Sequence, residues 1–144
     1  MKIQIINEKI TPEDLYPQTS GSAGIDLKAI LSNPINLYPK EKYKFSTGIK
    51  VAIPDKHVGI LVPRSSTGLR GLWLANIVGI IDSDYRGEVI VGLINTSELP
   101  ITINPMDRIA QLIVTTHYNY NQISIVDSLD ETERNSNGFG STGV

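Results

Sequence analysis

Short apolar runs separated by turn residues fill most of the 144-residue chain. Several of the runs alternate polar and apolar positions, as half-buried strands do. Turn signals recur about every 8–12 residues, without a long amphipathic helical pattern. Strands are expected at residues 2–6, 25–29, 35–38, 43–53, 57–62, 101–103, 108–114 and 123–126. The pattern predicts an all-β sandwich, barrel or jelly roll.

The stretch from residue 76 to residue 94 has a distinctive centre. One apolar strand ends at Asp82-Ser83-Asp84, Tyr85 follows, and a second apolar strand begins at Val89. β-Branched runs around a polar break with glycine are typical of a β-hairpin. Taken alone, the break is best interpreted as a solvated turn, because Asp, Ser and Gly are common in turns.

The composition changes after Val126. Residues 127–133 are acidic, and residues 134–144 are rich in Asn, Ser and Gly, with Phe139 as one aromatic. Such a segment buries too little apolar surface to order itself. We therefore expect a β domain of residues 1–126 and a flexible arm of residues 127–144. The arm is either a frayed terminus or a segment that orders over a ligand.

Charge and composition exclude several classes of protein. The net charge is −2 and the pI is about 5.6, so neither direct nucleic-acid binding nor attraction to a membrane surface is expected. The chain has no cysteine, which excludes disulfides and thiolate zinc sites. The N-terminal run is too short and too polar for a signal sequence. A cytoplasmic location is expected, which would be the host cytoplasm for a viral protein.

Polar residues cluster at four further points. Asp26 lies within an apolar segment, and Arg64 precedes two serines, either as part of a helix cap or as part of an anion site. Arg108 shares a strand with Gln111 and could also form a weak surface pair with Asp107. The arm contributes an arginine and a glycine-rich run, which could wrap a phosphate. Carboxylates, arginines, hydroxyls and an aromatic together suit a nucleotide polyphosphate.

Five segments of this chain resemble, in order, the five motifs of the trimeric dUTPases (deoxyuridine 5′-triphosphate nucleotidohydrolases). The segments are residues 23–27, 63–66, 76–87 and 108–111, and Arg134 with residues 138–143. The third segment is the most specific. Agreement at all five in order is not expected by chance.

The resemblance implies a jelly-roll-like β-barrel with a flexible C-terminal arm. It implies a homotrimer whose active sites lie at subunit boundaries, with the arm donated by another subunit. The implied reaction is hydrolysis of dUTP to dUMP and pyrophosphate with Mg²⁺. That activity limits uracil incorporation into DNA and supplies dUMP for dTMP synthesis.

The resemblance also implies roles for individual residues. Asp82 would be the base that deprotonates the water attacking the α-phosphorus. Asp26 and Gln111 would hold Mg²⁺ through water, a mode that suits this ion. Phosphate oxygens would be bound by residues of the second and fifth motifs: Arg64, Ser65, Ser66, Arg134, Gly140, Ser141 and Thr142. Phe139 would stack on uracil.

Uracil selectivity would come from the third motif. Backbone groups near Gly79 and Ile81, with the Asn76 amide, would complement uracil but not cytosine. Tyr85 would pack under the deoxyribose and leave no room for a 2′-hydroxyl. A binding site whose polar groups stay unpaired with a wrong substrate rejects that substrate by up to about 10⁴–10⁵-fold.

Two positions depart from the family pattern. Asn135 stands where glycine usually follows the arm's arginine, and asparagine tolerates left-handed backbone. In many members of the family, glycine comes directly after the first serine of the second motif. Here Ser66 and Thr67 stand between Ser65 and Gly68.

Asp84 is expected to have a structural role, such as a salt bridge to an arginine. Two alternative functions stay open: a dCTP deaminase of the same fold, and a nucleotide-gated regulator that binds a protein partner.

Overall fold

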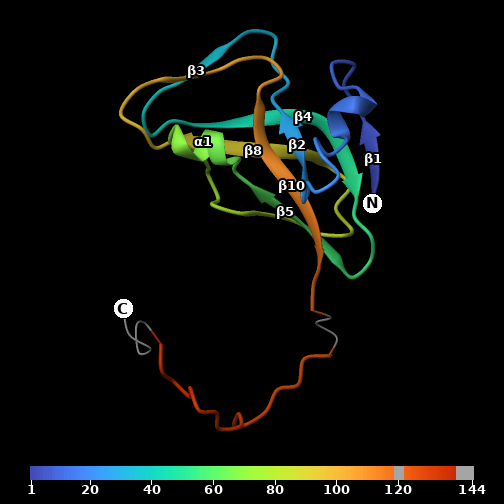
Figure 1. The fold of residues 1–144 in the computed structure, drawn as a ribbon, viewed down its shortest axis with the longest axis vertical. Coiled ribbons are helices and arrows are strands. Elements are labelled where there is room, and N and C mark those ends of the chain that lie inside the picture. Colours follow the sequence, from blue (N-terminus) through green and yellow to red (C-terminus); the bar gives the residue numbers. More distant parts are fainter. Residues whose placement is uncertain (119–121, 139–144) are drawn as a thin grey trace.

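Two four-stranded antiparallel sheets form the body of the protein in the computed structural model, which describes residues 1–118 and 122–138 (Figure 1). The first sheet has the order β1 (Lys2–Ile5), β4 (Lys42–Ala52), β8 (Glu88–Asn95) and β6 (Leu72–Leu74). The second has the order β2 (Gly24–Lys28), β10 (Arg108–Thr116), β5 (His57–Val62) and β7 (Gly79–Ile81).

Smaller elements complete the fold. Strands β3 (Ile35–Leu37) and β9 (Ile101–Ile103) form a two-stranded sheet. A 3₁₀ helix, η1 (Pro12–Leu15), begins where Thr11 and Pro12 predict a helical turn. The other helix, α1 (Ser65–Leu69), follows β5. Within the described ranges, no helix is long and apolar enough to cross a membrane.

One core joins the sheets, because alternate residues of each strand point inward. In β8, Val89, Val91 and Leu93 are completely buried, whereas Ile90 between them is exposed. Inward residues of the second sheet, such as Leu27 and Leu112, belong to the same apolar cluster. The expected all-β, jelly-roll-like fold is therefore confirmed, although the strand pairs found in the described residues form open sheets and no closed ring.

The expected hairpin around Asp82 is wrong in its pairing. Strand β7 pairs with β5 in the second sheet, and β8 pairs with β4 and β6 in the first. The loop of residues 82–87 therefore crosses from one sheet to the other. Both strands are apolar because they pack into one core from opposite sides, a pattern that a hairpin would also produce.

Two further differences concern short strands. Strand β6 is present, although no strand is expected there from the sequence. Residues 123–126 form no strand, and Ile125 is 98% exposed. Its apolar pattern is that of a strand, but the described part of this chain offers it no partner strand.

An ion pair attaches η1 to the second sheet. Lys28, at the end of β2, donates a hydrogen bond to Asp14, and the Thr11 backbone N–H donates to the same carboxylate at 2.9 Å. The Lys28 hydrogen bond, followed by that of Thr11, lowers the pKa of Asp14 below its ordinary value. Asp14 therefore contributes stability that depends on pH.

We expect Asp14→Asn to unfold at a lower urea concentration than the parent at pH 7. A lowered folded-state pKa adds stability above the ordinary carboxyl pKa, and this stability is lost as the pH falls through the lowered value. The difference between variant and parent should therefore shrink toward about pH 3, in urea unfolding at several pH values. Glu13→Gln at the adjacent exposed position is the matched control. A difference that stays constant with pH would contradict the ion-pair explanation.

Candidate active site

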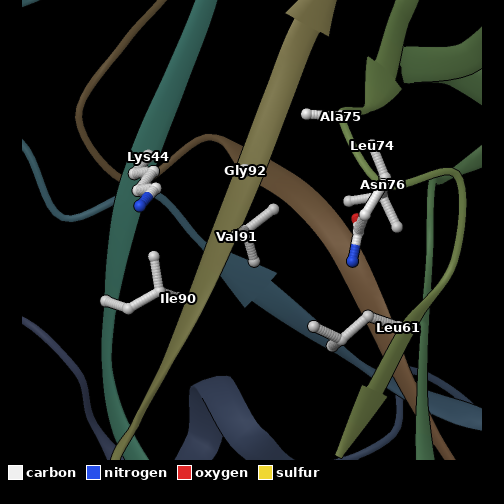
Figure 2. Close-up of a pocket in the computed structure, with 8 residues that line it drawn as sticks. All are labelled: Lys44, Leu61, Leu74, Ala75, Asn76, Ile90, Val91 and Gly92. Atoms are coloured by element: carbon white, nitrogen blue, oxygen red, sulfur yellow. The ribbon is translucent and has the colours of Figure 1, made fainter.

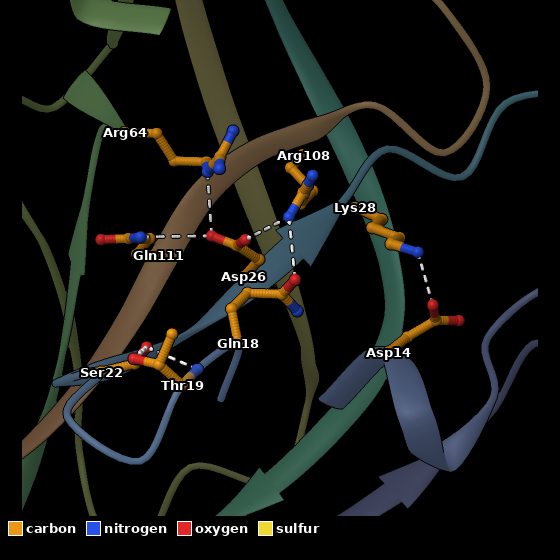
Figure 3. A network of polar contacts seen from close by, with 9 residues as sticks. All are labelled: Asp14, Gln18, Thr19, Ser22, Asp26, Lys28, Arg64, Arg108 and Gln111. Carbon is orange, nitrogen blue, oxygen red and sulfur yellow. Dashed lines mark hydrogen bonds and ion pairs between the residues drawn. The ribbon is translucent and has the colours of Figure 1, made fainter. Parts of the chain in front are cut away.

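Asp26 lies at the centre of a polar network on the second sheet (Figure 3). Its side chain is 5% exposed. Its Oδ1 atom accepts hydrogen bonds from Arg64 Nε at 2.9 Å and Gln111 Nε2 at 3.2 Å. Its Oδ2 atom accepts from Arg108 Nη1 at 3.3 Å. A buried carboxylate on β2 therefore fixes Arg64, which precedes α1, and both Arg108 and Gln111 of β10.

A β-bulge makes this network possible. Arg108 and Gln111 are three residues apart, and in a regular strand an odd spacing places side chains on opposite faces. The register between β10 and β2 shifts between Arg108 and Ala110. The extra residue, Ile109, is buried in the core and returns Arg108 to the face of Gln111. The alternative of a surface pair between Arg108 and Asp107 is not found, because Arg108 bonds Asp26 while Asp107 accepts the Asn104 N–H at 2.8 Å.

Helix α1 presents two serine hydroxyls beside Arg64. Its N-cap is Arg64 and not a serine, so the predicted serine cap is wrong. Ser65 and Ser66 lie in the first turn, and both are exposed. A polar pocket of about 250 Å³ is lined by Arg64, Ser66, Arg70 and Arg108, among others. The arrangement can bind an anion, and Arg70 and Arg108 join it although neither is among the predicted substrate-binding residues.

The loop of residues 82–87 is held by its own hydrogen bonds. The Asp82 carbonyl accepts the Tyr85 N–H at 3.2 Å, and Tyr85 Oη donates to the Glu88 carbonyl at 2.9 Å. A Cβ at Gly87 would lie 2.3 Å from Tyr85 Oη, so only glycine allows this ring position. Asp82 is exposed at the start of this loop.

The expected partner of Asp84 is not found. Asp84 is exposed and takes part in no ion pair of the described residues. Arg86, the adjacent cation, instead donates to the backbone carbonyls of Ser83 and Tyr85 at 2.7 and 2.8 Å. The salt-bridge expectation for Asp84 is therefore wrong within the described chain.

A pocket of about 470 Å³ adjoins the turn between β6 and β7 (Figure 2). Asn76 lines it with apolar residues, but Gly79 and Ile81 do not. Ile77 in the same turn has φ of 66°, a left-handed conformation that is strained for a β-branched residue. Such strain persists only where the surroundings impose it, and it is concentrated at functional sites.

Gly79 and Ile81 belong to an edge strand. They lie in β7, which among the described residues is the last strand of its sheet and pairs on one side only. The N–H and C=O groups of its open edge are therefore available to a ligand. A Cβ at Gly79 would come within 2.9 Å of Leu61 Cβ, so glycine is needed for this packing.

Asp82 and the Asp26 network are far apart within one chain. Two strands separate β2 from β7. In the register of the sheet, Asp82 lies four residues along the strand direction from the position level with Asp26. Strand spacing and rise place the two carboxylates roughly 20 Å apart. One chain therefore does not bring its own Asp82 and Asp26 to a single small ligand.

The arm is described as far as Gly138. Arg134 Nε donates to the Asn137 carbonyl at 3.0 Å, and Asn135 has φ of 44°. This is the left-handed region, which asparagine tolerates better than most residues. Four predicted site residues lie outside the described residues: Phe139, Gly140, Ser141 and Thr142.

The donor set around Asp26 suits a metal ion that is held indirectly. No group of three or more His, Asp or Glu side chains is suited to a metal in the described ranges. Asp26 accepts three hydrogen bonds, which leaves about one of its four lone-pair sites for a further donor. This suits an ion held mainly by substrate oxygens and water, as Mg²⁺ usually is.

Comparison with known proteins places the chain in a family. Residues 12–143 match the dUTPase family model. The chain is 43% identical to the deoxyuridine 5′-triphosphate nucleotidohydrolase of Finegoldia magna, with 99% of both chains covered. The chain therefore belongs to the dUTPase family.

Solved structures support the fold. The dUTPase of Staphylococcus bacteriophage 80alpha, a mutant with dUpNHpp, has a TM-score of 0.82 at 21% identity, covering 99% of this chain and 98% of that one. A mutant dUTPase of phage phi11 of S. aureus, described as coordinating a structural Mg(II) ion, has a TM-score of 0.77 at 20% identity and covers 90% and 98%.

We expect Asp26→Asn to lower the free energy of unfolding by about 1–3 kcal/mol, because two partly exposed arginines lose their shared carboxylate. Urea unfolding at pH 7 measures this. Asp84→Asn removes the same charge from an exposed position and should change stability by less than about 0.5 kcal/mol. Equal losses in the two variants would show that the network does not hold the sheet.

Proposed function

We propose that the protein hydrolyses dUTP to dUMP and pyrophosphate. The observation that carries the proposal is the continuity of β7 with the loop of residues 82–87. The open edge of β7 leads directly into Asp82 and Tyr85. One short segment can therefore recognise a base through its backbone and also supply a carboxylate. The family and the names of its curated members support the same reaction.

Asp82 acts as the general base in this proposal. It is exposed at the end of β7, where it can accept a proton from a water that attacks the α-phosphorus. Arg64, Ser65 and Ser66 bind phosphate oxygens and offset the charge that develops on them. Arg134 and residues 140–142 of the arm bind the terminal phosphate, with Phe139 stacked on the base.

Uracil is recognised through backbone in this proposal. The edge groups of Gly79 and Ile81, with the Asn76 amide, pair with the two carbonyls and the N–H of uracil. Cytosine reverses one donor and one acceptor, so buried groups would stay unpaired. The Tyr85 ring, fixed through Glu88, lies under the sugar and excludes a 2′-hydroxyl.

Mg²⁺ is the proposed cofactor. Asp26 and Gln111 would hold it through water, using the lone pair that the arginines leave free on the carboxylate. When bound, the ion neutralises phosphate charge and orients the triphosphate. The phage phi11 dUTPase described as coordinating a Mg(II) ion is consistent with this choice.

A homotrimer with shared sites is the proposed assembly. The separation of roughly 20 Å between Asp82 and Asp26 favours a site that combines the loop of one copy with the network of another. Residues 1–126 form the catalytic domain, and residues 127–144 form an arm that a further copy donates. Exposed apolar side chains in residues 122–138 support an arm that packs on another molecule. We expect the enzyme in the cytoplasm.

The alternatives are not favoured. Neither a dCTP deaminase nor a purely regulatory nucleotide switch accounts for a match to the dUTPase family across residues 12–143. A deaminase would release ammonia from dCTP, and a switch would bind dUTP without turnover. Both outcomes are read in the same assay as the proposed reaction.

We expect Asp82→Asn to lower kcat for dUTP by about 10²–10⁴-fold, because the variant lacks a base for the attacking water. Pyrophosphate release is measured with Mg²⁺ on dUTP, dCTP and UTP. Asp84→Asn, two residues along the same exposed loop, is the matched control and should keep parental turnover. Ammonia from dCTP, binding of dUTP without turnover, or full activity of Asp82→Asn would overturn the proposal.

A further inference from the structure

A basic groove lies beside the loop that contains Asp82. It has a volume of about 340 Å³, and its lining contains three cationic residues and no acidic one. The lining residues are Lys2, Ile3, Gln4, Lys50, Val51, Ala52 and Arg86. The function proposed above assigns no role to this groove.

The register of the sheet explains how the groove is built. Lys50 in the middle strand β4 lies opposite Gln4 of β1 and Glu88 of β8. Residues directly opposite one another project from the same face, so Lys50 is central on the outer face of the sheet. Arg86 reaches this face from the loop two residues before β8 begins.

Glu88, the acid opposite Lys50, accepts hydrogen bonds from Ser46 Oγ and the Gly48 N–H and forms no ion pair with the groove in the described chain. None of the groove's three cations has an acidic partner within ion-pair distance in residues 1–118 and 122–138. Arg86 uses one of its nitrogens for two backbone carbonyls, which leaves further N–H donors available. The groove is therefore suited to an acidic peptide segment.

The arm supplies such a segment. Four of the seven residues 127–133 are acidic, and all seven are exposed. None of these four acids takes part in an ion pair of the described residues. The segment also carries apolar surface, because Ile125 is 98% exposed and Leu129 is 84% exposed.

The described part of the arm is held by its own contacts. The hydrogen bonds found for residues 127–138 within the described ranges join arm residues to one another. In Figure 1 this part of the chain, in orange-red to red, lies apart from the two sheets. Exposed apolar side chains in an extended segment favour burial against another molecule.

We propose that the acidic segment 127–133 of one copy docks in the basic groove of a second copy. This inference rests on the proposed function and names the surface that guides the arm. Docking beside Arg86 places Arg134, the next residue after the segment, next to the loop of Asp82. The charges thus bring the phosphate-binding end of the arm to the active site and lower the entropic cost of its closure.

Cross-linking tests the docking directly, because the chain has no cysteine of its own. Lys50→Cys and Asp130→Cys are made in separate chains, mixed by co-refolding, and treated with a flexible bismaleimide. We expect a covalent two-chain product on a denaturing gel. Lys42→Cys mixed with Asp130→Cys is the matched control, since Lys42 lies about 26 Å from Lys50 along the same strand. That pair should give no product.

The outcomes separate the two proposals. If the mixture of Lys50→Cys and Asp130→Cys chains hydrolyses dUTP but gives no two-chain product, the docking proposal alone is overturned. A double variant with both cysteines in one chain is also diluted with an excess of parent chains. A cross-link within that single chain would also overturn the docking proposal. A parent enzyme without dUTP turnover would overturn the proposed function, and the gel would still report on docking.

A charge exchange gives a second, independent measurement. Lys2→Glu with Lys50→Glu should lower kcat/KM for dUTP by up to about fivefold per charge pair at low salt. Asp130→Lys with Glu131→Lys should have a similar effect, and the combined exchange should restore activity. Lys42→Glu, a matched charge change outside the groove, should leave activity unchanged. Losses that simply add in the combined variant would contradict the proposal.

Discussion

The candidate site depends on the hydrogen bonds that the Asp26 carboxylate accepts. This carboxylate is buried in β2 and accepts hydrogen bonds from Arg64, Arg108 and Gln111. Without it, two guanidinium groups would repel each other on one face of the sheet. With it, their remaining N–H groups form a positive surface beside the serines of α1. The carboxylate thus holds three flexible side chains in a preorganised arrangement that is suited to an anion.

A second constraint comes from the way the chain changes sheets. Residues 82–87 carry the chain from the edge of one sheet to the middle of the other. The edge position of β7 leaves one side of its backbone without a partner strand in the described residues, and the crossing loop exposes Asp82. The same topology puts Asp82 roughly 20 Å from Asp26. In the proposed mechanism, base recognition and phosphate binding are therefore separated in each copy, and catalysis depends on assembly.

Much of the fold follows from local pattern, because alternation and turn residues locate strands such as β5 and β9. The pairing of the strands does not follow from this pattern, because an apolar strand can belong to either sheet. The bulge at Ile109 is likewise set by tertiary packing, so regular strand alternation alone places Arg108 on the face opposite Gln111. Residues 123–126 look like a strand in sequence but lack a partner strand in the described part of their own chain.

Complementation between two inactive variants tests the central claim that each active site combines two copies. Asp82→Asn and Arg64→Ala chains are refolded alone and as an equal mixture, and pyrophosphate release from dUTP is measured. Random assembly of shared sites should restore roughly a quarter of parental activity in the mixture, because one site in four combines an intact loop with an intact network. A mixture no more active than the separate variants would contradict the account.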